Sequence, residues 1–242
     1  MSLVWAHTRA GVLELLRYPS FSVPTLLLPA AALLLFGARH SPAPPNVLLA
    51  SYAALALLGV AFFQFGVGIA AERISPWHAF LRTLPAPPLV RFAARIGAAL
   101  VFGLGAAAGV VAVAVVTTPV SLPPSRWLLL AVVLLGGSVP SALLGIALGY
   151  WLTPRGALPL ANLLYLGLSY VGGFWTLSRH LPPLLAPIAP IVPTRLWGSL
   201  LAAAVGAAPW RPRDGALLAA WGALFAVLAL WGFRRDEGQR FR

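Results

Sequence analysis

Long apolar stretches separated by short polar ones form the main pattern of the chain. A helix that crosses a hydrocarbon core of about 30 Å needs roughly 20 apolar residues. Six stretches reach or approach that length, and we predict a transmembrane helix in each: residues 21–38, 47–71, 96–118, 127–152, 158–177 and 216–233. None of the six contains Asp or Glu. The pattern therefore predicts an all-α membrane protein, a single transmembrane domain over residues 1–242 with six transmembrane helices.

The distribution of arginine predicts how these helices are oriented. Cytoplasmic loops of membrane proteins carry an excess of basic residues. If the N-terminus lies in the cytoplasm, 11 arginines fall on the inside and six on the outside. We therefore predict a multi-pass protein of the cytoplasmic (inner) membrane with both ends inside.

Residues 178–215, between the last two predicted spans, contain two further apolar runs. The run 184–192 is interrupted by Pro187 and Pro190, and the run 196–208 is only 13 residues long. Runs of this length are more often interfacial or re-entrant than spanning. If 196–208 did cross the membrane, the arginine-rich tail would lie outside, against the charge rule. We therefore predict a re-entrant outer segment, with a seventh span as the alternative.

Residues 3–18 read as an amphipathic helix. At 100° per residue, one face collects apolar side chains and the opposite face collects polar ones. The apolar face holds Val4, Trp5, Val12, Leu15 and Leu16, and the polar face holds His7, Glu14 and Arg17. This pattern predicts an interfacial helix over residues 1–20. An ordinary beginning of the first span is the alternative.

The loop after the second predicted span has the signature of a short helix. Ser75 and Pro76 are typical of an N-cap followed by the first helical residue. Apolar residues then recur at helical spacing, with Arg82 outside their face: Trp77, Phe80, Leu81 and Leu84. Such a helix either docks in a groove of a partner protein or rests on lipid headgroups. The spacing favours neither over the other.

The amino-acid composition supports assignment to the membrane class and indicates what surrounds the protein. Hydrophobic residues make up 60% of the 242 residues and charged residues only 9%, whereas soluble domains carry about 25% charged residues. The net charge of +12 comes from arginine without any lysine. Because the arginines lie between apolar runs, anionic lipid headgroups explain them better than nucleic acid. The expected surroundings are thus a lipid bilayer, with no nucleic-acid partner.

Several kinds of chemistry are missing from the sequence. A P-loop requires lysine, which the chain lacks, so the chain is expected to bind no ATP or other cofactor and to be no enzyme. The chain has no cysteine, and its four histidines lie apart from acidic clusters, so we expect no metal site. Ion-coupled transporters commonly embed carboxylates in their spans. Their absence disfavours a secondary transporter, which remains the alternative together with a non-transporting membrane scaffold.

Some small and polar residues within the predicted spans are candidates for more specific roles. The pairs Gly105/Gly109 and Gly145/Gly149 allow close helix approach, either within one bundle or in a dimer. Six polar residues either line a translocation path or serve helix packing: Gln64, Ser138, Ser141, Asn162, Tyr165 and Tyr170.

Four stretches, in order along nearly the whole chain, resemble the membrane subunits of ABC-2-type transporters. They are the N-terminal helix leading to Arg-Tyr-Pro at 17–19, GVGIAAERISPWHAFLRTLPAPPL (66–89), LPPLLAPIAPIVPTRLWGSLLAAAVG (181–206) and WGFRRDEGQRFR (231–242). In this resemblance they correspond to an elbow helix, the exit of the second span, an outer hairpin and a basic tail. One departure is that residues 74–77 stand where the family often has a further acid and a glycine.

The resemblance implies a permease subunit of an ATP-driven ABC exporter. Such a subunit pairs with a second permease copy or a paralogue, and with ATP-binding subunits that hold ATP and magnesium. Residues 75–84 would then form the helix that couples ATP hydrolysis to the spans. The coupling region would comprise Glu72, Arg73, Ser75, Trp77, Phe80, Leu81, Arg82 and Leu84.

Overall fold

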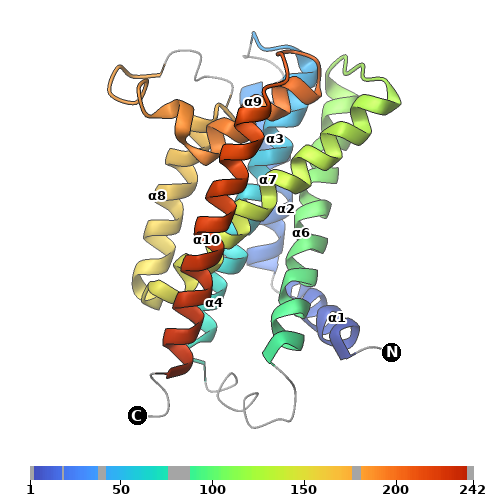
Figure 1. Cartoon of the computed structure of the whole chain (residues 1–242). Coiled ribbons are helices and arrows are strands. Elements are labelled where there is room, and N and C mark those ends of the chain that lie inside the picture. Colours follow the sequence, from blue (N-terminus) through green and yellow to red (C-terminus); the bar gives the residue numbers. More distant parts are fainter. Residues whose placement is uncertain (1–2, 18, 38–41, 76–87, 176–180, 239–242) are drawn as a thin grey trace.

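The computed structural model describes residues 3–17, 19–37, 42–75, 88–175 and 181–238. Helices account for all regular secondary structure within these residues, and they form an elongated bundle (Figure 1). In chain order the elements are α1 (Leu3–Leu16), α2 (Pro19–Ala32), the π-helix η1 (Leu33–Gly37), α3 (Pro45–Val60), the π-helix η2 (Ala61–Val67), α4 (Gly68–Glu72), α6 (Pro88–Thr117), α7 (Pro124–Trp151), α8 (Pro154–Gly172), the 3₁₀-helix η3 (Ala189–Ile191), α9 (Pro193–Ala204) and α10 (Pro212–Gly238).

Proline marks the beginning of most of these helices. It is the first residue of α2, α3, α6, α7, α8, α9 and α10. Proline suits this position because its fixed φ is already helical and its missing N–H would have no intrahelical partner. The loops therefore end, and the helices begin, where the sequence places these prolines.

Four helices in the described part of the chain are long and apolar enough to cross a membrane. They are Pro45–Glu72, which combines α3, η2 and α4, and Ile96–Thr117, Pro124–Trp151 and Pro212–Asp236. They confirm the predicted helices at 47–71, 96–118, 127–152 and 216–233.

The other two predicted spans are helical but shorter or less apolar. Residues 19–37 form α2 and η1, whose apolar part, Val23–Gly37, is shorter than a typical span. The helix α8 has 19 residues and ends at Gly172, five residues earlier than predicted. It ends there because Gly173 adopts a left-handed conformation with φ of 79°. That these two helices cross the membrane stays a prediction.

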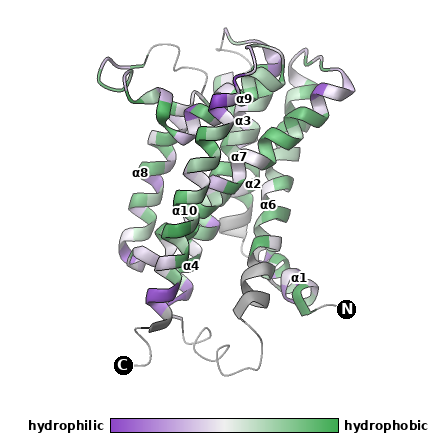
Figure 2. Ribbon diagram, viewed as in Figure 1, coloured by the Kyte–Doolittle hydropathy of each residue, from purple (hydrophilic) through white to green (hydrophobic). Residues whose placement is uncertain are grey.

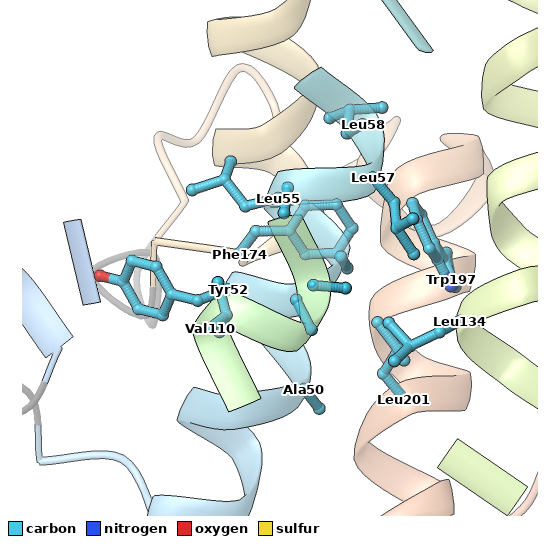
Figure 3. Packing of buried hydrophobic residues seen from close by; sticks show 14 of the residues in the cluster. Ala50, Tyr52, Leu55, Leu57, Leu58, Val110, Leu134, Phe174, Trp197 and Leu201 are labelled. Carbon is cyan, nitrogen blue, oxygen red and sulfur yellow. The ribbon is translucent and has the colours of Figure 1, made fainter. Parts of the chain in front are cut away.

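The second span is the central helix of the bundle. Every residue from Leu48 to Leu58 is buried, so α3 is covered on all sides by other helices. Within its most apolar stretch 72% of residues are buried, against 28% for α10. Figure 3 shows Leu57 with Trp197 of α9 and Leu134 of α7 on one side of α3, while Tyr52 points the other way.

Hydrophobic residues predominate along the helices of the bundle (Figure 2). Large hydrophobic side chains are widely exposed along α7, α8 and α10, including Leu128, Leu163 and Val227, each with more than 60% of its surface accessible. A water-soluble bundle would carry polar residues at such positions. The exposed surface therefore fits contact with lipid.

The glycine pairs serve contacts within this chain. A Cβ atom on Gly145 would lie 2.1 Å from the carbonyl oxygen of Ala61, and one on Gly149 would lie 2.7 Å from the Cβ of Ile69. Gly105 and Gly109 lie against Leu26 of α2 at ordinary contact distance. The interpretation as packing positions within one bundle is confirmed for Gly145 and Gly149, whereas for Gly105 and Gly109, where a Cβ would fit, both interpretations stay open.

The segment before α10 contains a short buried helix. The helix α9 has 12 residues, about 18 Å, so it is too short to cross a bilayer by itself. Trp197 Nε1 donates to the carbonyl of Val133 at 2.9 Å, and Thr194 Oγ1 donates to that of Leu168 at 2.6 Å. This segment lies at the end of the bundle opposite α1 and the last turn of α10 (Figure 1). Re-entry into the membrane stays a prediction.

The helix α1 is separate from α2 and packs against the lower part of α6 (Figure 1). Its contact with α6 uses small residues: Thr8 is buried and its hydroxyl lies 3.4 Å from the carbonyl of Ala94. Trp5 and Leu16, from the predicted apolar face, are more than half exposed. Both side chains are therefore accessible from outside the bundle, and contact with the membrane interface remains the prediction for this helix.

Candidate functional site

The candidate site is built around Arg73, which caps the C-terminus of α4. It lies two residues before Ser75, where the predicted coupling helix begins. The guanidinium group reaches from the end of the second span to the ends of α7 and α10. We call the contact region the Arg73 junction, meaning Arg73, Asp236 and the carbonyl groups of Gly149, Tyr150 and Leu152.

The guanidinium group divides its donors between two helices. Its Nη2 and Nε lie 2.7 Å and 2.8 Å from Oδ1 of Asp236 in α10. Its Nη1 donates to the carbonyl oxygens of Tyr150 at 2.8 Å, Gly149 at 3.1 Å and Leu152 at 3.3 Å. Only arginine offers such a planar fork of donors, because lysine carries a single compact ammonium group.

The local sequence explains why the end of α7 offers these carbonyl groups. Leu152 adopts an extended conformation, and Thr153 and Pro154 then begin α8. The last carbonyl groups of an α-helix have no intrahelical partner and carry partial negative charge. A cation at this position therefore satisfies hydrogen bonds and interacts favourably with the helix dipole.

The carboxylate of Asp236 is nearly inaccessible, with 6% of its side chain exposed, while Arg73 is 22% exposed. Removing one member of a buried ion pair commonly costs about 3–5 kcal/mol, because the other charge is left without a partner. The partial exposure of Arg73 places this pair toward the lower end of that range. The pair is therefore a substantial link between the second span and α10.

Aromatic contacts bring the ends of α7 and α10 together beside this link. The ring of Tyr150 lies edge-to-face with Phe233, and that of Trp151 with Trp231, at centroid distances of 5.6 Å and 4.8 Å. Trp151 Nε1 also donates to the carbonyl of Leu228 at 3.0 Å. Arg235 lies over the ring of Trp151 at 5.3 Å. The two helices therefore meet in a specific packed arrangement at this end.

A cavity of about 430 Å³ opens beside the junction. Its lining comes from the ends of α4, α7 and α10 and from the loop that leads into α8. The lining residues include Arg73, Ile74, Thr153, Arg235 and Asp236. The cavity thus lies next to the point at which the chain leaves the bundle toward residue 76.

The structure describes only part of the predicted coupling region. Glu72 is exposed at the end of α4, and Ser75 is partly buried, its N–H donating to the carbonyl of Glu72 at 2.9 Å. Five of the predicted residues lie outside the described residues: Trp77, Phe80, Leu81, Arg82 and Leu84.

The six candidate residues for a translocation path do not form one cluster of unpaired polar side chains in the described part of the chain. Ser138, Ser141 and Asn162 each donate to a carbonyl of their own helix, and Asn162 is exposed on α8. Tyr165 is buried, with its ring edge-to-face against Phe63 at 5.5 Å. Tyr170 is partly buried. Tyr165 thus packs against another helix, and for the other residues both interpretations stay open.

Gln64 differs from the other candidates. It lies in η2, and its side-chain Nε2 is buried without a hydrogen-bond partner. An unpaired buried amide is unfavourable, and π-helical turns are frequent at functional sites. Of the six candidates, Gln64 therefore keeps the strongest claim to a place on a translocation path.

Sequence reasoning included Arg73 but missed its partners. Asp236 stands between arginines in the tail, which signals an ion pair without showing which arginine binds it. The other partners are backbone carbonyl groups of α7, which every residue type supplies, so the sequence does not indicate them. Within the described residues no group of His, Asp and Glu could hold a metal ion.

Comparison with known proteins agrees with a membrane transport role. No family model matches the chain. It is 24% identical over 191 residues to a Bacillus subtilis (strain 168) protein named "Putative transport permease YvfS", and the match covers 78% of this chain and 77% of that relative. The similarity supports a relationship to transport permeases. Together with the four long apolar helices, it supports a multi-pass membrane protein.

Proposed function

We propose that this chain is the membrane-spanning permease subunit of an ATP-driven ABC exporter of the ABC-2 type. It lies in the cytoplasmic membrane with six spans and both ends inside. A separate subunit binds and hydrolyses ATP, and a second permease copy or a paralogue completes the translocation unit. The substrate leaves the cytoplasm between the two permease subunits.

The observation that carries this proposal is the Arg73 junction. A subunit driven by a separate ATPase needs a firm attachment between the segment that meets the ATPase and the spans that move. Arg73 lies immediately before the predicted coupling segment and bonds to the ends of two long helices, α7 and α10. The similarity to a protein named as a transport permease supports the same reading. The absence of lysine, and so of any P-loop, agrees with ATP hydrolysis on another chain.

Co-purification tests the proposal directly. The tagged permease is expressed with the product of an adjacent ATPase gene, isolated in mild detergent and assayed for ATP hydrolysis. We expect a stable complex, and we expect Trp77→Glu and Leu81→Glu to abolish association or stimulation because they place charge on the docking face. His78→Glu is the matched control, since His78 lies outside that apolar face and is not among the predicted coupling residues. Absence of association, or equal activity in all four proteins, would contradict the proposal.

A vesicle experiment separates this function from the alternatives. Efflux driven by a secondary transporter would proceed without ATP and would collapse on addition of an ionophore, whereas ATP-driven export would not. A scaffold would show no flux, and Gln64→Leu would change nothing.

A further inference from the structure

We infer that Arg73 is a positioning residue that makes the ends of α4, α7 and α10 move as one unit when a partner acts on the chain beyond Ser75. This inference rests on the proposed function for the source of the motion. It goes beyond that function by assigning the transmission step to one side chain and its bonds.

The chain connects Ser75 directly to the second span through Arg73. The helix α4 has only five residues and is continuous with the second span through η2. A displacement applied beyond Ser75 reaches Arg73 before it reaches the rest of the second span. Since Arg73 is bonded to Asp236 and to the carbonyl groups of Gly149 and Tyr150, the same displacement acts on α10 and α7.

Separation of the three helix ends would be energetically unfavourable. If the ends moved apart, a carboxylate with 6% exposure would lose its ion pair with Arg73, and two carbonyl groups at the end of α7 would lose the Arg73 donor. Loss of charged hydrogen bonds by buried groups is strongly unfavourable. Movement of all three ends together keeps every bond. The junction therefore transmits displacement and does not act as a latch that opens.

The opposite end of α7 provides a natural comparison. Arg126 also caps a helix, with Nη1 donating to the carbonyl groups of Ala203 at 2.9 Å and Ala204 at 3.2 Å, at the end of α9. The chemistry is similar, but Arg126 lies at the start of α7, far from the second span's exit. Its loss weakens a helix cap without touching the proposed transmission.

The first test uses the purified permease alone and measures hydrogen–deuterium exchange in residues 68–75, 146–152 and 229–238. We expect Arg73→Gln to raise exchange in all three segments together, by about a hundredfold, because it removes the ion pair with Asp236 and the hydrogen bonds to α7 at once. Arg126→Gln should raise exchange around 193–206 instead. A rise confined to 68–75 in the Arg73 variant would overturn the inference. Arg73→Lys, which keeps the charge and loses the fork, serves if Arg73→Gln does not fold.

The second test uses the complex with the ATP-binding subunit, with and without ATP plus vanadate. In the wild type all three segments should change exchange together, and in Arg73→Gln only 68–75 should respond. A joint response in Arg73→Gln would overturn the inference. If no complex forms, or if nucleotide changes nothing in the wild type, the proposed function fails, while the first test still decides whether the three ends are one unit.

Rescue separates transmission from a purely structural role. The chain has no cysteine, so Arg73→Cys with Asp236→Cys can be joined by a short bis-thiosulfonate reagent. Without the reagent the nucleotide response should be lost at 146–152 and 229–238, and with it the response should return at 229–238, the segment that the linker joins to position 73. A joined protein that assembles with the ATPase but stays without the response would refute a closed, transmitting junction.

Discussion

The substitution Gly145→Ala tests how much the close contact between α7 and η2 stabilises the bundle. In Gly145→Ala the new Cβ would lie 2.1 Å from the carbonyl oxygen of Ala61 and 3.0 Å from its carbonyl carbon. Both atoms belong to the backbone and cannot rotate away. Ordinary contact begins near 3.4 Å, so α7 and η2 must separate locally by about 1 Å.

The separation has a cost that follows from the packing. A gap of this size forfeits about a quarter to a half of each dispersion contact and is too narrow for lipid to fill. Three side chains lie along this contact: Phe65, Ile69 and Leu148. A quarter of the dispersion energy of three side chains, each with about 40 contacts of about 0.1 kcal/mol, is about 3 kcal/mol. We therefore expect Gly145→Ala to lower the free energy of unfolding by about 3 kcal/mol.

The assay is unfolding of the purified permease in mixed micelles by increasing SDS, followed by tryptophan fluorescence. Gly136→Ala is the matched control on the same helix, because nothing lies within 4 Å of a Cβ there; it should change stability by less than about 1 kcal/mol. Gly149→Ala, with its nearest contact at 2.7 Å, should fall between the two. Equal stability of the Gly145 and Gly136 variants would refute the packing argument.

Three further predictions concern other parts of the bundle. Trp197→Phe removes the bond to the carbonyl of Val133 and should cost about 1 kcal/mol in the same SDS titration; an unchanged midpoint would show that the bond contributes nothing. Gln64→Leu replaces an unpaired buried amide with an apolar group, so stability should stay constant or rise by about 1 kcal/mol while ATP-driven efflux falls; unaltered efflux would exclude Gln64 from the path. Ala208→Cys and Gly238→Cys should react with an impermeant maleimide from opposite sides of the membrane, and reaction from the same side would contradict the predicted topology.

The long apolar runs predicted the main helices well because lipid imposes a minimum length on each span. The starts of the helices were also present in the sequence, since most begin at a proline. The end of α8 was placed too late because Gly172 and Gly173 stand side by side in an apolar run, and only the conformation of Gly173 identifies the cap.

The arrangement of the helices could not be predicted in the same way. The span at 47–71 is apolar on every side, so periodicity gives it no inward face and does not reveal that it is central. Gly145 and Gly149 indicated a close contact, but nothing indicated that a π-helix would be the partner. The bond from Arg73 to Asp236 joins residues 163 positions apart and depends on tertiary packing.

The burial of α3 on all sides has a consequence for genetic variation. In a systematic mutational scan, substitutions at residues 48–58 should be deleterious on every face of α3. Each of these positions is buried against other helices of the same chain. Along α10, whose apolar stretch is only 28% buried, one apolar residue should readily replace another on the outer face. Tolerance would then map the depth of each helix within the bundle, and an unexpectedly intolerant outer face would mark the surface that a second subunit covers.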